Sequence, residues 1–174
     1  KRIKNVANII NSYHKKRYKL IVVSSAMSGV TNDLIRKSKE ISENFLPSEY
    51  DVLVSSGEQV ACSLIAARLS HIGLKSRSWL SWQIPIITEG SHKNAKILSI
   101  YKKKILDYLK KGGIPIVTGF QGIDINERIK TIGRGGSDAS AIMLAKFFKA
   151  ERCIIYTDVE GVYTTDPNKL KKAR

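Results

Sequence analysis

The segment IPIVTGFQGIDINERIKTIGRGGSDASAIMLAKFF, residues 114–148, decides the fold class. Its first five residues are apolar or β-branched, which predicts a buried strand at 114–118. The looser alternation that follows predicts a short hairpin around residues 124–127. A glycine-rich turn then leads into helical spacing over residues 137–149. Strand, turn and helix in this order indicate an α/β fold.

The rest of the chain continues this alternation of helices and strands. Apolar residues at helical spacing predict helices at 1–16, around 34–35, from 55–58 to 71–73 and at 95–111. Short apolar runs predict strands at 20–25, 74–79, 85–88 and 152–157, and Pro47 predicts a loop at 44–48. Strands separated by such helices favour one domain, residues 1–174, with a parallel sheet between helical layers. In such sheets, ligands bind beyond the carboxyl ends of the strands.

The chain is strongly basic, with 30 Lys and Arg against 15 Asp and Glu and a net charge of +15. Such a charge attracts polyanions, so nucleic acid is a partner to consider. The lysines are spread along the sequence, without the interleaved aromatic residues of a single-strand binder and without a recognition helix. We therefore expect a solvated lysine-rich surface and no nucleic-acid partner.

Cysteine and histidine give no sign of a metal site. Cys62 and Cys153 lie far apart inside apolar runs, which predicts buried, reduced thiols and a reducing compartment. His14, His71 and His92 show no metal-binding spacing, so surface or hydrogen-bonded core roles are expected for them. No apolar stretch approaches the ~20 residues of a membrane span, and no basic-then-apolar leader is seen. We therefore expect no membrane partner and a cytoplasmic location.

The sharpest chemical signal is GRGGSD at residues 133–138, placed directly before a helix. Glycines let the backbone approach a ligand closely, and the free N–H groups at a helix start favour an anion. Arg134 adds a two-pronged donor for a carboxylate, while Asp138 can attract an ammonium group. The turn therefore predicts a site for a zwitterionic amino acid. The alternative is that Ser137 only caps the helix and the glycines only form a turn.

Four segments carry a more specific signal when they are taken together. They are SSAMSGVTN at residues 24–32, SSGEQ at 55–59, GRGGSD at 133–138 and TDVEGVYTTDP at 157–167. In this order they resemble the aspartate kinases of the amino acid kinase family. The resemblance implies a three-layer α/β/α sandwich with an open, mainly parallel sheet. It also implies homodimer formation and the phosphorylation of L-aspartate to 4-phospho-L-aspartate by ATP with Mg²⁺, the first step toward lysine, threonine and methionine.

Site residues of the family carry over to matching positions of this sequence. The resemblance implies a substrate pocket at Thr31, Glu58, Arg134, Gly135, Gly136 and Ser137. It implies catalytic roles for Arg134 and Asp138, and a nucleotide site at Thr157, Asp158, Tyr163, Asp166 and Lys169. Two alternatives stay open. The segment TDVEGVYTTDP can be an ordinary surface loop, and Glu58 can be a glutamate favoured by the dipole in the first turn of a helix.

The sequence departs from the family pattern in three places. The Lys-Phe-Gly-Gly-Thr-Ser phosphate loop is missing, and Asn168 and Lys169 stand where an arginine is common. The chain also stops at Arg174, where the family continues into regulatory domains. We therefore expect an N-terminally incomplete kinase domain without C-terminal regulatory domains. The alternatives are a catalytically inactive truncated remnant, or a family member that acts on another acid such as acetylglutamate or UMP.

Overall fold

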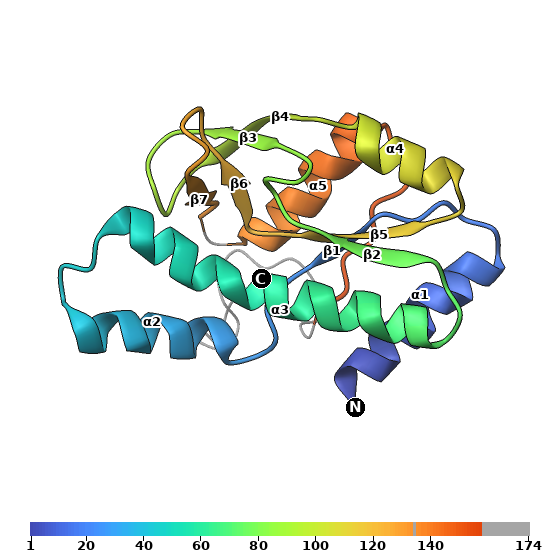
Figure 1. The fold of residues 1–174 in the computed structure, drawn as a ribbon, viewed down its shortest axis with the longest axis horizontal. Helices are drawn as coiled ribbons and strands as arrows, with labels where there is room; N and C mark the ends of the chain where they lie inside the picture. Colours follow the sequence, from blue (N-terminus) through green and yellow to red (C-terminus); the bar gives the residue numbers. More distant parts are fainter. Residues whose placement is uncertain (134, 158–174) are drawn as a thin grey trace, which may run out of the picture.

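The computed structural model describes residues 1–133 and 135–157, and it alternates helices and strands along the chain (Figure 1). The helices are α1 (Arg2–Lys15), α2 (Val30–Ile41), α3 (Pro47–His71), α4 (Lys103–Lys110) and α5 (Gly136–Phe148). The strands are β1 (Val22–Ser24), β2 (Ser76–Trp79), β3 (Ile86–Glu89), β4 (Lys96–Ile100), β5 (Ile114–Thr118), β6 (Gln121–Ile123) and β7 (Ile129–Thr131). The predicted helix at 1–16, the strand at 114–118 and the helix at 137–149 are confirmed.

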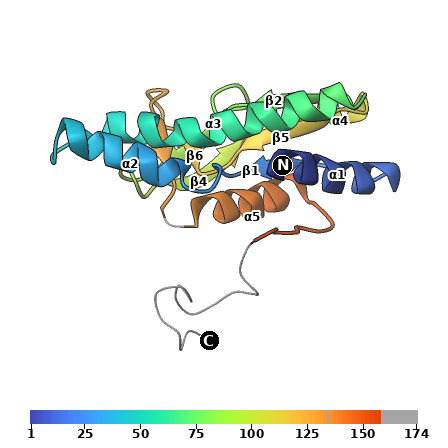
Figure 2. The ribbon, with the colours of Figure 1, turned by 90° about the horizontal axis from the view of Figure 1, so that it is seen from below.

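A parallel sheet in the order β1-β5-β2 forms the middle layer of the domain. Every residue of its central strand β5 is buried. On one face, Ile114 and Ile116 pack in a cluster with residues of α1 and α3; on the other, Val117 packs with Ile105 of α4 and Leu144 of α5. Figure 2 shows α3 and α5 on opposite sides of the sheet. The predicted α/β fold with a parallel sheet between helical layers is thereby confirmed.

A second, mixed sheet has the order β4-β3-β6-β7. The pairs β3–β4 and β6–β7 are antiparallel, whereas β3 and β6 are parallel. The predicted hairpin around residues 124–127 is confirmed: Asp124 Oδ1 accepts hydrogen bonds from the N–H groups of Asn126 (2.9 Å) and Arg128 (3.0 Å). Strand β7 ends at Thr131, shortly before GRGGSD at residues 133–138, which we call the glycine turn.

The predicted helix at 95–111 is wrong in its first half, because residues Lys96–Ile100 form the edge strand β4. Thr88 pairs with Ile97 and Ile87 with Ser99, so Leu98 is an extra, bulged residue. The bulge places Ile97 and Ile100, three residues apart, on the same buried side. A spacing of three is typical of helices, and this explains the incorrect prediction.

Two further boundaries differ from the sequence prediction. Helix α3 begins at Pro47, not near residues 55–58, because proline fits the first turn of a helix, where its missing N–H is not needed. The predicted strand at 152–157 is irregular, and no strand pairs with it in the described part of the chain. Its apolar residues Ile154 and Ile155 are exposed.

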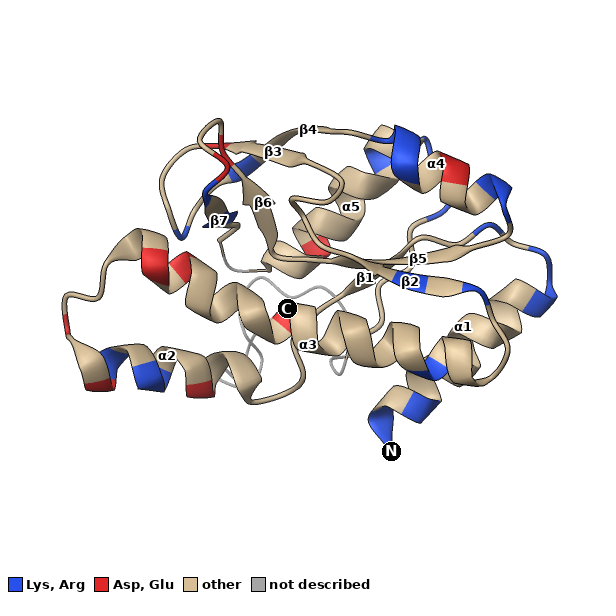
Figure 3. Cartoon of the chain, in the orientation of Figure 1, with Lys and Arg blue, Asp and Glu red and all other residues tan. Residues whose placement is uncertain are grey.

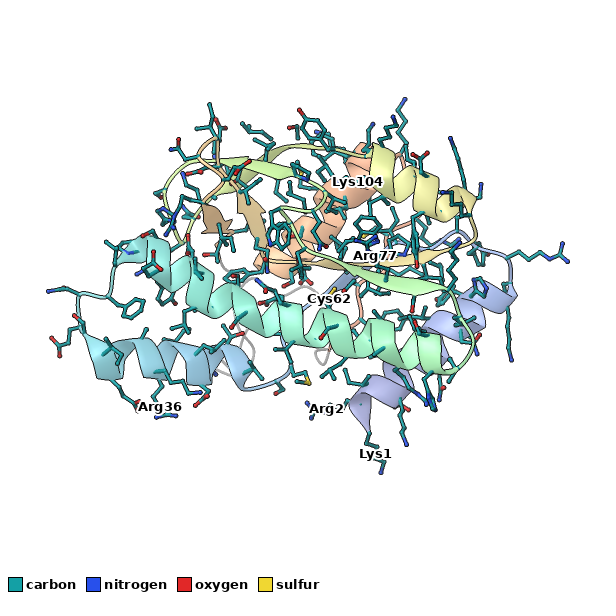
Figure 4. All side chains as sticks on the ribbon, viewed as in Figure 1. Lys1, Arg2, Arg36, Cys62, Arg77 and Lys104 are labelled. Carbon is teal, nitrogen blue, oxygen red and sulfur yellow. The ribbon has the colours of Figure 1, made fainter. Side chains whose placement is uncertain are left out.

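The two cysteines lie in different environments. Cys62 of α3, labelled in Figure 4, is buried and donates a hydrogen bond to the Ile116 carbonyl over 3.0 Å. Burial raises the pKa of its thiol to about 11. Cys153 is exposed, so the prediction of a second buried thiol is wrong. The segment around it is apolar but lies outside the sheet, which removes the burial that the sequence implied.

Helix α3 is 25 residues long, and it differs from the expectation that no stretch of the sequence suits a membrane span. By length and composition alone it could cross a membrane, but half of its most apolar window is buried inside the fold. A core helix passes the same test, so the evidence for a membrane span is weak.

The basic residues are spread over α1, α2, α4 and β2 and do not gather on one element (Figure 3).

Candidate active site

A hollow of about 250 Å³ lies where β1 and β5 end and α5 begins. We call it the Glu58 hollow, and it is lined by Ser25, Thr31, Glu58, Phe120, Gly135, Ser137 and Asp138. Five of these residues come from the substrate and catalytic positions that the sequence predicts. Ser25 follows β1 and Phe120 follows β5, so the hollow lies beyond the carboxyl ends of two parallel strands.

Glycine at 119 lets the ends of β1 and β5 and the start of α5 meet next to this hollow. The Gly119 N–H donates to the Ser24 carbonyl over 2.9 Å and so joins the ends of β1 and β5. A Cβ on Gly119 would lie 3.0 Å from the Ser24 oxygen and 3.1 Å from Cα of Ser137. Any larger residue would therefore push α5 away from the strands.

The glycine turn is held against the ring of Phe120. A Cβ on Gly136 would lie 2.5 Å from that ring, so only glycine fits at this position. Phe120 has a left-handed backbone (φ 64°); its N–H donates to Ser140 Oγ (3.0 Å) and its carbonyl accepts the N–H of Ile132 (2.9 Å). These two bonds fix the backbone of Phe120, whose ring packs against Gly136 at the start of α5.

The start of α5 lies at the hollow. Gly135, in the left-handed conformation (φ 71°), is the N-cap residue, and no side chain among the described residues caps the helix. Ser137 is therefore not the cap, which contradicts the alternative explanation of GRGGSD as a simple capped turn. The first N–H groups of a helix have no intrahelical acceptor and carry the positive end of the helix dipole. This end of the hollow is thus suited to a carboxylate or phosphate.

Glu58 supplies a buried carboxylate on another wall of the hollow. Its Oε1 accepts the N–H of Ala26 over 3.1 Å, whereas Oε2 is buried without a hydrogen-bond partner among the residues that the structure describes. Burial raises the pKa of Glu58 to about 7, although the Ala26 N–H partly opposes this rise. Because α3 begins at Pro47, Glu58 lies about three turns into the helix. The dipole of a first turn therefore does not explain it.

Close packing brings this carboxylate to the hollow. A Cβ on Gly57 would lie 3.0 Å from Cβ of Ala26 and 3.2 Å from Cγ1 of Val30, so glycine allows α3 to approach the turn before α2. Thr31, the second residue of α2, is half-buried and lines the hollow from this side. The motif SSGE thus combines Glu58, which lines the hollow, with Gly57, which lets α3 come close enough for Glu58 to do so.

Comparisons with known proteins agree with this geometry. The profile described as "Amino acid kinase family" matches residues 1–174. The chain belongs to the amino acid kinase family. An aspartokinase of Rickettsia conorii is 46% identical over 176 residues, covering 99% of this chain and 44% of that protein. The chain therefore spans less than half the length of this relative.

Solved structures place the same chain among amino acid kinases. E. coli aspartokinase III in complex with aspartate and ADP has a TM-score of 0.80 and 25% identity, over 99% of this chain and 49% of that one. The aspartate kinase from Synechocystis has a TM-score of 0.77 and 38% identity, over 99% of this chain and 28% of that one. The family fold predicted from the four sequence segments is confirmed.

The structure does not place every predicted site residue of this family member. Arg134 lies outside the described residues, as do Asp158, Tyr163, Asp166 and Lys169. Thr157 is described; it is exposed and does not line the Glu58 hollow. Within the described ranges, the structure therefore brings five of the predicted substrate and catalytic residues together, and both their roles and the nucleotide side stay predictions.

Sequence reasoning missed two residues that line the hollow, Ser25 and Phe120. Both belong to segments with a visible signal, since polar and glycine-bearing residues follow each strand at this point. It also missed Asp51, a fully buried carboxylate of α3. No short motif marks Asp51, because its partners come from distant parts of the chain.

Proposed function

We propose that the protein is an aspartate kinase, which transfers the γ-phosphoryl group of ATP to the side-chain carboxylate of L-aspartate. The product is 4-phospho-L-aspartate, which serves the synthesis of lysine, threonine and methionine. The proposal is carried by one observation: Oε2 of Glu58 is buried without a partner among the described residues, beside the start of α5. A buried charge needs a partner, and an ammonium group of a small zwitterion provides it.

The two ends of the hollow suit the two charged ends of an amino acid. Glu58 Oε2 accepts a hydrogen bond from the substrate ammonium, and this contact favours the ionised form of Glu58. The free N–H groups of Gly136 and Ser137 bind the α-carboxylate, with Arg134 as a further, two-pronged donor. Asp138, exposed at the rim, orients the substrate. The side-chain carboxylate is then left free to react.

In the transfer step, an oxygen of that carboxylate attacks the γ-phosphorus. The bond from phosphorus to the bridging oxygen breaks and ADP leaves with the electron pair, so no net proton transfer is required. ATP supplies the phosphoryl group, and Mg²⁺ offsets its charge. Thr157, Asp158, Tyr163, Asp166 and Lys169 are proposed to hold the nucleotide, in line with the ADP complex of E. coli aspartokinase III. Such reactions depend mainly on positioning and charge stabilisation.

A coupled assay of ADP release tests the proposal on the protein encoded by the complete gene. We expect turnover with L-aspartate and none with acetylglutamate or UMP, the substrates of the rival family hypotheses. ADP release with one of those acids instead of aspartate would overturn the substrate assignment. Absence of turnover with all three would favour the inactive-remnant alternative.

The assignment of Arg134 has a matched control. Arg134→Ala should raise the KM for aspartate strongly, because it removes a charged donor to the carboxylate. Arg128→Ala removes an exposed arginine of the β6–β7 hairpin that pairs with Glu49 instead. It should leave that KM unchanged. An unchanged KM in Arg134→Ala would remove this residue from the site.

A further inference from the structure

Asp51 forms a buried polar cluster outside the Glu58 hollow. The residue is fully buried and its carboxylate accepts hydrogen bonds from three neighbours. These donors are Thr131 Oγ1 (2.6 Å), His92 Nδ1 (2.7 Å) and the Lys93 N–H, which lies 3.2 Å from both carboxylate oxygens. The donors come from β7 and from the turn between β3 and β4, so one side chain of α3 connects three elements.

The cluster lies directly before the glycine turn. Thr131 is the last residue of β7, and its carbonyl also accepts the N–H of Ala95 over 3.0 Å. Two residues later, a Cβ on Gly133 would lie 2.8 Å from Oδ1 of Asn94, so the β3–β4 turn also packs against the first glycine. The chain therefore enters the glycine turn from a point that Asp51 and the β3–β4 turn hold in place.

The same helix carries Asp51 and Glu58. They are seven residues apart, which is about two helical turns, so their side chains leave α3 on the same side. Glu58 reaches the hollow, while Asp51 reaches the strand that leads into the opposite wall of the hollow. Helix α3 thus sets the spacing between the carboxylate of Glu58 and the glycine turn.

We propose that Asp51 is a positioning residue, which holds the end of β7 against α3 and thereby places the glycine turn opposite Glu58. The proposal rests on the proposed function for what the turn binds. Stability alone does not call for a carboxylate here, because burying a charge is costly and apolar residues of similar volume often stabilise as well. Its four hydrogen bonds instead fix direction and distance, which a substrate site needs.

Three variants of the complete protein test this role. Asp51→Ala removes all the bonds of the cluster, and Asp51→Asn keeps an acceptor oxygen for Lys93 or Thr131. Thr131→Val removes only the bond between Asp51 and β7 and is the milder change. Thr88→Val is the matched control, since it also removes a buried threonine bond in the second sheet, from Thr88 Oγ1 to the Ile123 carbonyl (3.0 Å), but leaves every bond to Asp51 in place.

We expect Asp51→Ala and Thr131→Val to raise the KM for aspartate about tenfold or more, with the KM for ATP within about twofold of the wild type. Asp51→Asn should recover part of the loss, and Thr88→Val should change neither KM. An unchanged aspartate KM in folded Thr131→Val, or an equal rise in Thr88→Val, would overturn the proposal. If Asp51→Ala fails to fold, Thr131→Val decides.

Hydrogen exchange separates this inference from the proposed function. If the wild type does not phosphorylate aspartate, the proposed function fails, but the positioning of the turn can still be measured. The amide of Ala139, which donates to the Gly135 carbonyl over 2.9 Å and closes the first turn of α5, should exchange faster in Thr131→Val than in Thr88→Val. Equal exchange in the two variants would show that Asp51 does not position the turn.

Discussion

Replacing Glu58 by glutamine should remove a pH dependence of stability that this one side chain creates. In the unfolded chain the carboxyl has its ordinary pKa of 4.5, whereas burial in the fold raises it to about 7. The folded state therefore holds the proton more tightly, and stability from this group is greatest below pH 4.5. This stabilisation decreases as the pH rises from 4.5 to about 7. At 1.36 kcal/mol for each pKa unit, the total decrease is about 3 kcal/mol.

Denaturant unfolding of the wild type and of Glu58→Gln, over about pH 4.5 to 8, measures this term. Glutamine has no proton to lose, so the stability of the variant relative to the wild type should increase by about 3 kcal/mol across this range. Any cost of the buried amide is independent of pH and leaves this slope unchanged. Glu49→Gln, at an exposed glutamate of the same helix, is the control and should show no such increase.

The same variant should bind aspartate poorly, because the amide cannot attract an ammonium group. Glu58 would then destabilise the fold at neutral pH while serving the site, as functional residues often do. If the stability difference between Glu58→Gln and the wild type does not change with pH, this explanation is wrong. The carboxyl would then have its ordinary pKa in the folded protein, and burial would not disfavour its ionised form.

Two further predictions concern the walls of the hollow. Gly136→Ala places a Cβ 2.5 Å from the ring of Phe120 and should raise the KM for aspartate about tenfold in initial-rate kinetics. Gly73→Ala is the control, because alanine is strained there but its Cβ lies in open space, and it should leave this KM unchanged. In the wild type, the KM for aspartate should fall as the pH rises through about 7, since Glu58 must be ionised to bind the ammonium group; a flat profile would contradict this role.

Local sequence was sufficient for the elements that border the hollow. Strand β5 is apolar or β-branched along its whole length because both of its faces are covered, and a nearly continuous apolar run is the signal of such a strand. Helix α5 has a glycine turn before it and helical spacing within it. The hollow follows from these features, because the polar residues after β1 and β5 meet at the ends of parallel strands.

Other features depend on contacts between residues that are far apart in the sequence, and local sequence patterns do not predict such contacts. The bulge at Leu98 exists only because β4 pairs with β3, and it made a strand look helical. The left-handed backbone of Phe120 is held by Ser140 and Ile132. Asp51 gains its role from donors that lie 41 to 80 residues away in the chain. Side chains that act through distant partners give no periodic signal.

A crystal structure of the complete protein with bound L-aspartate is the direct test of whether Glu58 and the start of α5 bind the substrate. We predict the substrate ammonium within hydrogen-bonding distance of Glu58 Oε2 and the α-carboxylate at the N–H groups that begin α5. Aspartate bound elsewhere, or bound here with Glu58 turned away from it, would show that this assignment is wrong.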